Sequence, residues 1–180
     1  MKRLNKILVP TDLSEKSLRA LHYGCGLAAE DQAAMVILHV ANDLNAWELY
    51  SEDLALIEQN SKPWPIDRVL AEANLDLARF LEPQLQRLKR VPIVTRRVVL
   101  GSVAKQIVAV AEEEDTDLII MSPRRHRGLR HFLSGGITGR VTRLSPCPVL
   151  SITAPQPSNP WRGKLKPLLL GWRRQTVASV

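Results

Sequence analysis

A basic loop that ends in two glycines is the part of this 180-residue sequence whose residue types best suit binding of a ligand. Residues 122–136 carry four arginines and close on Gly135 and Gly136, directly before a segment with helical spacing. Glycines at a helix start let backbone N–H groups approach an anion, and the helix dipole favours negative charge there. One interpretation is therefore a nucleotide or another phosphate ligand. The other is a turn and helix N-cap at the glycines, with the arginines more often a solvated surface loop than a ligand clamp.

An aspartate, two histidines and a cysteine are the other residues whose types could support chemistry. Asp12 could accept hydrogen bonds from a ribose hydroxyl, or it could cap the first helix, and the two roles are compatible. His126 and His131 have no acidic or cysteine neighbour at metal-ligand spacing, so no metal site is predicted. Cys147 lies between two prolines without a histidine placed to activate it, which favours a small packed residue over a nucleophile. No catalytic residue is predicted.

Five short runs rich in Val, Ile and Leu alternate with stretches of helical spacing, which is typical of parallel strands joined by crossover helices. Strands are expected at residues 6–9, 34–40, 93–100, 117–121 and 147–152. The first helix is expected after an N-cap at Thr11, Asp12 or Ser14, and the second over about 66–90, where Pro83 should kink or split it. Two more helices are expected, one after Gly101 and Ser102 and one over 137–144. Residues 41–64 are expected to form a long loop. The fold class is therefore α/β, an open parallel sheet with helices on both faces.

The position of a ligand follows from this class of sheet. In open parallel sheets, ligands bind at the carboxyl ends of the strands, where the strand order reverses. For the order 3-2-1-4-5, that point lies between the first and fourth strands, where residues 10–12 face residues 122–136.

The charge is unevenly distributed along the chain. The sequence has 25 Lys and Arg and 18 Asp and Glu, for a net charge of +7. All acidic residues lie between Asp12 and Asp117, so residues 118–180 carry +11 and no acidic side chain. The basic residues fall in two groups, one around 122–143 and one in 161–180, and neither group supports a prediction of specific nucleic-acid binding.

The composition changes after residue 153. Residues 154–160, APQPSNP, read as a Pro-rich linker, and residues 161–180 form a basic, apolar tail that the α/β unit of residues 1–153 does not need. We favour packing of the tail on the protein's own dimer, and the alternative is an acidic or otherwise anionic partner.

The location of the protein is predicted from what the sequence lacks. Two cysteines are too few for a disulfide framework, and the apolar run near the start is broken by Pro10 and Asp12. No apolar stretch approaches the roughly 20 residues of a transmembrane helix. We therefore expect a soluble, cytoplasmic protein without a transmembrane segment.

Three blocks of the sequence resemble the universal stress protein family, in the family's order and spacing over residues 3–153. They are KILVPTDLSEKSLRAL, GSVAKQIVAVAEEEDTDLIIMS and SGGITGRVTRLSPCPVLSI. The resemblance implies a Rossmann-like fold of the adenine nucleotide alpha hydrolase type, with strand order 3-2-1-4-5. It also implies a homodimer that pairs through the last strand, residues 147–152.

Members of that family divide into those that bind ATP and those that do not. The binders share a motif after the fourth strand: Gly, two residues, Gly, nine residues, Gly, then Ser or Thr. On this chain the motif falls on Ser122, Arg125, Gly135 and Gly136, so one of its three glycines remains. Side chains at the first two positions block close backbone approach to a phosphate, and Pro123 removes a donor from the loop.

The other family positions are intact. By resemblance, Asp12 corresponds to the acidic residue near the ribose. Pro10, Thr11 and Val40 correspond to the residues lining the adenine, and Met121 and Ile137 correspond to two apolar contacts. The sequence thus predicts a non-enzymatic stress-response dimer with a degenerate or weakly occupied nucleotide pocket. Two alternatives stay open: a switch that binds ATP or another adenine nucleotide, and an interaction module that uses the basic tail.

Overall fold

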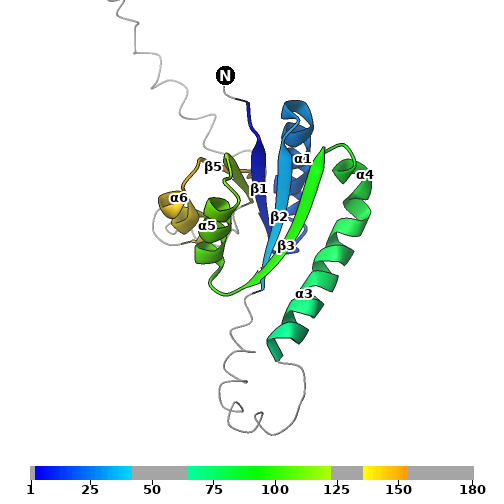
Figure 1. Cartoon of the computed structure of the whole chain (residues 1–180), viewed down its shortest axis with the longest axis vertical. Helices are drawn as coiled ribbons and strands as arrows, with labels where there is room; N and C mark the ends of the chain where they lie inside the picture. Colours follow the sequence, from blue (N-terminus) through cyan, green and yellow to red (C-terminus); the bar gives the residue numbers. More distant parts are fainter. Residues whose placement is uncertain (1–2, 42–64, 123–135, 154–180) are drawn as a thin grey trace, which may run out of the picture.

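Five parallel strands form one sheet in the order β3-β2-β1-β4-β5 in the computed structural model of the chain (Figure 1). The structure describes residues 3–41, 65–122 and 136–153. β1 pairs with both β2 and β4 and so lies at the centre of the sheet, while β3 and β5 form its edges. The α/β fold class and the strand order expected from the sequence are confirmed.

The bounds of the elements are as follows. The strands are β1 (Lys6–Thr11), β2 (Ala34–Ala41), β3 (Ile93–Leu100), β4 (Leu118–Met121) and β5 (Val149–Ser151). The helices are α1 (Leu18–Asp31), α3 (Pro65–Leu81), the short 3-10 helix η1 (Glu82–Gln84), α4 (Leu85–Leu88), α5 (Val103–Glu113) and α6 (Ile137–Leu144).

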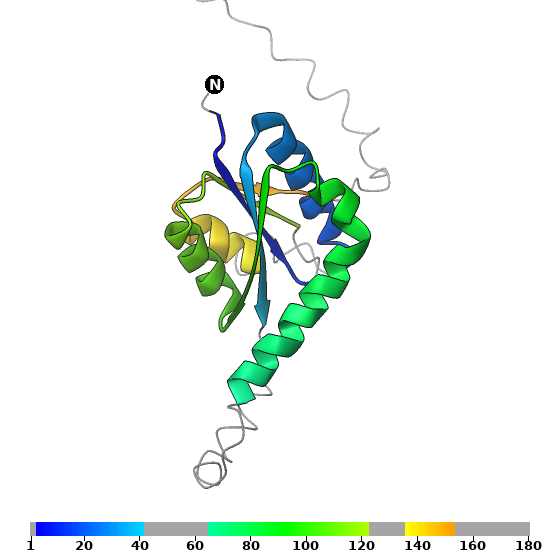
Figure 2. The same ribbon diagram turned by 45° about the vertical axis from the view of Figure 1, so that its right-hand side comes forward.

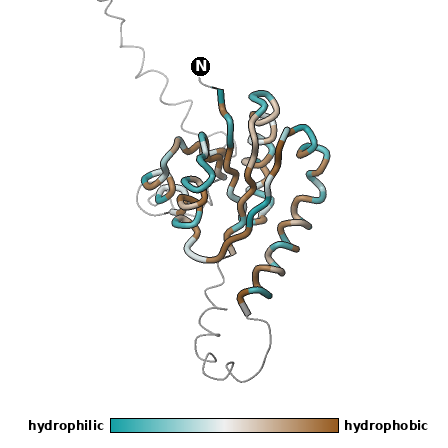
Figure 3. Tube along the Cα trace, in the orientation of Figure 1, coloured by the Kyte–Doolittle hydropathy of each residue, from teal (hydrophilic) through white to brown (hydrophobic). Residues whose placement is uncertain are grey.

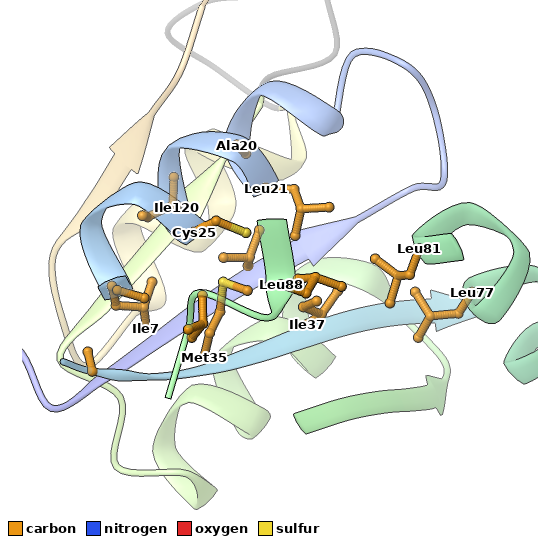
Figure 4. Close-up of a cluster of buried hydrophobic side chains, with 14 residues drawn as sticks. Ile7, Ala20, Leu21, Cys25, Met35, Ile37, Leu77, Leu81, Leu88 and Ile120 are labelled. Atoms are coloured by element: carbon orange, nitrogen blue, oxygen red, sulfur yellow. The ribbon is translucent and has the colours of Figure 1, made fainter. Parts of the chain in front are cut away.

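Helices cover both faces of the sheet, and each face has its own apolar cluster (Figure 2). On one face, α1, α3 and α4 pack over alternate residues of the central strands, among them Ile7, Met35 and Ile37 (Figure 4). On the other face, α5 and α6 pack over the intervening residues, among them Leu8 and Leu38. Strands buried on both sides need continuous apolar runs, and Figure 3 shows hydrophobic residues along most of the sheet.

The first helix begins later than the sequence predicted. Expected N-caps were Thr11, Asp12 and Ser14, but α1 starts at Leu18 with Ser17 as its N-cap, and no side-chain capping bond is made there. The side chains of the expected caps instead bond within the turn that precedes the helix, a common competitor of helix capping for these residue types. The N-cap prediction was therefore wrong in position.

The first strand runs past its proline. Residues 6–9 were expected, with Pro10 as the stop, but β1 continues to Thr11 and Pro10 pairs with Leu38 of β2. The described ladder with β4 ends at Leu8, so the missing N–H of Pro10 falls beyond it. A proline is tolerated in this central strand because no partner there requires its donor.

Two other prolines, Pro83 and Pro148, each interrupt an element that the sequence predicted. Pro83 lies in η1, which separates α3 from α4, so the predicted split of the long helix is confirmed. The last strand was expected over 147–152 but β5 covers three residues and begins after Pro148, whose carbonyl still accepts a bond from the Ile119 N–H. The polar centre of β3, with Thr95 and Arg96 exposed, lies at an edge, as predicted.

α1 lies very close to the sheet at Gly24. A Cβ at this position would come within 2.9 Å of Val9 Cγ2 and 3.5 Å of Met35 Sδ. Val9 is stiff at χ1 and fully buried in the central strand, so it has little room to move away. Gly26, two residues further along α1, is exposed and has no atom within 4 Å of the corresponding position.

These two glycines allow a matched test. We expect Gly24→Ala to lower the free energy of unfolding by about 1 kcal/mol, since overpacking outweighs the gain in helix propensity. Gly26→Ala should raise it by about 0.5–1 kcal/mol, because only the propensity term acts. Urea unfolding followed by circular dichroism measures both. Equal stabilisation by the two variants would contradict the close packing of α1.

A charged network joins β1, β3 and α5 at the amino edge of the sheet. The Glu114 carboxylate accepts hydrogen bonds from Lys6 Nζ at 3.0 Å and Arg97 Nη1 at 2.8 Å, and Arg97 Nη2 donates to Glu113 at 3.0 Å. The hydrogen bond from Lys6, followed by that from Arg97, lowers the pKa of Glu114 below its ordinary value. The side chains of Lys6, Arg97 and Glu114 are 22–32% exposed, so solvent screens the network only in part.

The lowered pKa gives a pH dependence of defined sign. A carboxyl whose pKa is lower in the folded state stabilises the protein above its unfolded pKa, and this contribution is lost as pH falls through the folded pKa. We therefore expect Glu114→Gln to reduce the free energy of unfolding at pH 7, with a difference from the unchanged protein that shrinks at acidic pH below the ordinary glutamate range.

Glu72→Gln serves as the control for this pH series. Glu72 pairs with Arg68 at 3.6 Å on the surface of α3, where the two side chains are 67% and 81% exposed, and such pairs contribute about 0.5 kcal/mol or less. Chemical unfolding at several pH values would contradict the role of Glu114 if its variant followed the same shallow profile as Glu72→Gln.

Candidate functional site

The carboxyl ends of β1 and β4 are neighbours in the sheet. β1 and β4 pair in parallel, and the strand order reverses between them, which is where open α/β sheets bind ligands. β1 ends at Thr11 and is followed by Asp12, and β4 ends at Met121 and is followed by Ser122. The structure thus places Asp12 and Ser122, one residue from each predicted half of the site, at the same edge of the sheet.

The turn between β1 and α1 is held by its own polar side chains. Thr11 Oγ1 lies 2.8 Å from Ser17 Oγ and accepts a bond from the Leu13 N–H at 3.0 Å. Asp12 Oδ1 accepts bonds from the N–H of Ser14, at 3.1 Å, and from its hydroxyl. Ser17 Oγ donates to the Ser14 carbonyl at 2.7 Å. The turn is therefore pre-organised without a ligand.

Leu13 completes this turn in an unusual conformation. Its φ of 59° lies in the left-handed region, which costs a residue with a Cβ about 1–2 kcal/mol. The hydrogen bond of its N–H to Thr11 and the packing of its half-buried side chain against the apolar cluster under α1 offset that cost. This conformation places Asp12 at the surface end of β1, half-buried.

The residues expected to line the adenine or to make an apolar contact divide between the two faces of the sheet. Pro10 and Thr11 are buried in β1, and the Thr11 hydroxyl meets Ser17 on the α1 side. Val40 and Met121 are 8% and 6% exposed and belong to the cluster under α5 and α6. They share the carboxyl edge with Thr11, but its side chain lies on the opposite face.

Ser122 has a buried hydroxyl without a partner among the residues that the structure describes. Its Oγ is excluded from solvent and makes no hydrogen bond within the part of the chain that the structure describes. Thr116, at the opposite end of β4, is 6% exposed, and its Oγ1 also makes no hydrogen bond within the described residues. A buried hydroxyl without a partner costs about 1–3 kcal/mol of desolvation.

Gly136 caps the start of α6. Its backbone is extended, with φ −68° and ψ 161°, and its carbonyl accepts a bond from the Arg140 N–H. A Cβ here would meet nothing within 4 Å, so the fold does not require glycine at this position. The N-cap interpretation of Gly136 is confirmed, and Ile137 follows as the first helical residue with its side chain 38% exposed.

Several predicted features lie outside the described residues. These are Arg125, Gly135, the other arginines and the histidines of the basic loop, residues 42–64, the Pro-rich linker and the basic tail. Within residues 3–41, 65–122 and 136–153, no group of three His, Cys, Asp or Glu could hold a metal ion, and no helix combines the length and apolarity needed to span a bilayer.

The two cysteines differ in setting. Cys25 is buried under α1, and burial raises the pKa of its thiol, an effect that the charge of Arg87 partly opposes. A raised pKa makes the thiol less reactive. Cys147 is half-buried beside the cluster under α5 and α6, with Ser145 Oγ donating to its carbonyl at 2.8 Å. It packs as predicted, although it is less buried than expected.

Sequence reasoning missed His39 as a residue of this edge. His39 lies opposite Thr11 in the β1–β2 register, half-buried, with Nδ1 3.1 Å from the Thr11 carbonyl. Its place inside an apolar strand run was the only available signal, since a polar residue in such a run needs a partner.

Comparison with known proteins identifies relatives that span almost the same length. The model of the universal stress protein family matches residues 3–152. Universal stress protein YxiE of Bacillus subtilis is 28% identical over 149 residues, which cover 82% of this chain and 98% of the relative. Universal stress protein MJ0577 of Methanocaldococcus jannaschii is 27% identical over 151 residues, covering 82% and 93%.

Solved structures show the same architecture. The structure of MJ0577 aligns with a TM-score of 0.63 at 25% identity and covers 86% of this chain and 99% of that one. UspA from Lactobacillus plantarum aligns with a TM-score of 0.58 at 22% identity, covering 84% and 99%. A universal stress protein in complex with cAMP gives 0.56 at 21% identity, covering 86% and 100%.

Three hydroxyls at the ends of β1 and β4 allow a test with matched substitutions. Thr11→Val should lower the free energy of unfolding by about 1–3 kcal/mol, because it leaves the Leu13 N–H without its acceptor and removes the Thr11 hydroxyl from its contact with Ser17 Oγ. Thr116→Val, at nearly the same burial, and Ser122→Ala should cost nothing or stabilise by up to about 1 kcal/mol, since each removes a hydroxyl that has no partner among the described residues. Denaturant unfolding decides this, and an equal loss in Thr116→Val and Thr11→Val would contradict it.

Proposed function

The chain belongs to the universal stress protein family, and we propose that it is a non-enzymatic stress-response protein whose nucleotide site is weak or empty. The observation that carries the proposal is Ser122. It stands where the ATP-binding members have the first glycine of their motif, and at the end of β4 it is half-buried with its Oγ excluded from solvent. A side chain there takes up space that the motif leaves for backbone approach to a phosphate.

The rest of the motif supports this proposal on sequence grounds. Arg125 stands in place of the second glycine, and Pro123 has no N–H to offer a phosphate. Arg125 supplies charge, but its bulk would have to move aside before the backbone could reach an anion.

The described side chains at the carboxyl edge of the sheet do not favour hydrolysis of a nucleotide. Asp12 already accepts two hydrogen bonds from Ser14, and its place at the end of β1 suits a ribose hydroxyl better than a water at a γ-phosphate. We therefore propose no catalytic residue.

A second candidate function is a switch that binds ATP or another adenine nucleotide. The pre-organised turn around Asp12 favours it, since a fixed turn lowers the entropic cost of binding. A universal stress protein of the same fold is in complex with cAMP. On this alternative, an adenine nucleotide would lie between Asp12 and the start of α6.

We further propose a cytoplasmic homodimer that pairs through the last strand. β5 is an edge of the sheet, and Val149 and Leu150 are half-buried, so the strand presents apolar side chains and backbone groups to a second copy. The basic tail of residues 161–180 is proposed to pack on this dimer, with an acidic partner as the alternative.

Calorimetry with Mg-ATP tests the proposed function. We expect no binding of the unchanged protein up to millimolar nucleotide. The double variant Ser122→Gly with Arg125→Gly, which restores the three glycines of the motif, should bind at least tenfold more tightly, because the backbone can then approach the phosphates. The two single variants show whether bulk at either position alone is sufficient to block binding.

The outcomes separate the two candidates. Micromolar affinity in the unchanged protein would overturn the weak-site proposal and favour the switch. Gly135→Trp should then abolish that affinity, and an unchanged affinity in Gly135→Trp would place the nucleotide elsewhere.

A further inference from the structure

His39 is a polar side chain in an otherwise apolar central strand, and it contacts the neighbouring strand at the candidate site. It lies opposite Thr11 in the parallel register, and its Nδ1 is 3.1 Å from the Thr11 carbonyl oxygen. A carbonyl oxygen only accepts hydrogen bonds, so Nδ1 must carry the proton. The contact therefore sets the neutral ring to the Nδ1–H tautomer.

The residue that His39 contacts is the first of the β1–α1 turn. Thr11 accepts from the Leu13 N–H and pairs with the Ser17 hydroxyl, and Ser17 in turn donates to the Ser14 carbonyl. These bonds all lie within residues 11–17. The bond from His39 comes from β2 instead, and it ties this turn to the adjacent strand.

We propose that His39 is a positioning residue of the candidate site: it fixes the Thr11 carbonyl and, through Thr11, the turn that presents Asp12. It acts through another residue and touches no ligand itself. The use of Asp12 by a nucleotide rests on the proposed function, whereas the link from His39 to the turn does not.

The test compares two substitutions at position 39 with one at a matched histidine. His39→Leu removes the donor, and His39→Asn keeps a side-chain N–H at a similar reach from the backbone. His22 is the control: it is also half-buried, and its Nε2 lies 2.7 Å from Gln84 Oε1, between α1 and η1. The readout is amide hydrogen exchange of Leu13 and Ser14 by NMR, measured without nucleotide.

We expect His39→Leu to speed exchange at Leu13 and Ser14 by about fivefold or more relative to the amides of β1, as loss of one hydrogen bond predicts. His39→Asn should recover most of the protection, and His22→Leu should leave these two amides unchanged. Unchanged exchange in His39→Leu, equal acceleration along all of β1, or no difference between the Asn and Leu variants would each overturn the proposal.

A measurement on the unchanged protein tests the proposal without depending on whether the variants fold. Nitrogen-15 NMR of the imidazole should show a protonated Nδ1 and a bare Nε2 at neutral pH, and a neutral ring protonated at Nε2 would overturn the proposal. Both readouts are ligand-free, so their outcome is separate from that of the calorimetry.

Discussion

The close approach of α1 to the central strand is the contact on which the rest of this structure depends. At Gly24 the helix backbone lies so near Val9 that a single methyl group would meet it at 2.9 Å. This proximity lets the apolar face of α1 fill the space over β1 and β2, and it fixes where the helix lies relative to the strand end. Residues 12–17 must then span from Thr11 to Leu18, and their polar side chains brace that span. The packing of the core and the shape of the candidate site are therefore linked through one short turn.

The strands could be predicted from sequence because their signal is local. A strand buried on both faces needs a continuous apolar run, and 34–40 and 117–121 show such runs plainly. The wrong predictions arise where a residue distant in the sequence determines the local structure. Pro10 looked like a stop, yet it stays in β1 because the ladder with β4 ends before it. The helix start depended on whether the side chains of Asp12 and its neighbours would cap α1 or bond within the turn, and both choices suit the same residue types.

The sequence predicted which edge of the sheet carries the candidate site, but it did not predict on which face of the sheet each side chain lies. Topology places the ends of β1 and β4 together, and the strand order implied by the family resemblance was sufficient to predict this. Which face each side chain takes depends on register, and the register puts Thr11 with α1 but Val40 and Met121 with α5 and α6. His39 was overlooked for the same reason, since its partner is a backbone carbonyl on another strand and leaves no mark in the local sequence.

The glycines separate what the fold requires from what a ligand requires. Gly24 has no room for a side chain, and Gly101 has a φ of 126°, so both are needed by the structure itself. Gly136 has an extended backbone and open space around it, so the fold gains nothing from glycine there. The structure also accommodates Ser122 at the carboxyl edge of the sheet, where its hydroxyl has no hydrogen-bond partner among the described residues. The strand order of the family therefore forms with a side chain at this position of the motif.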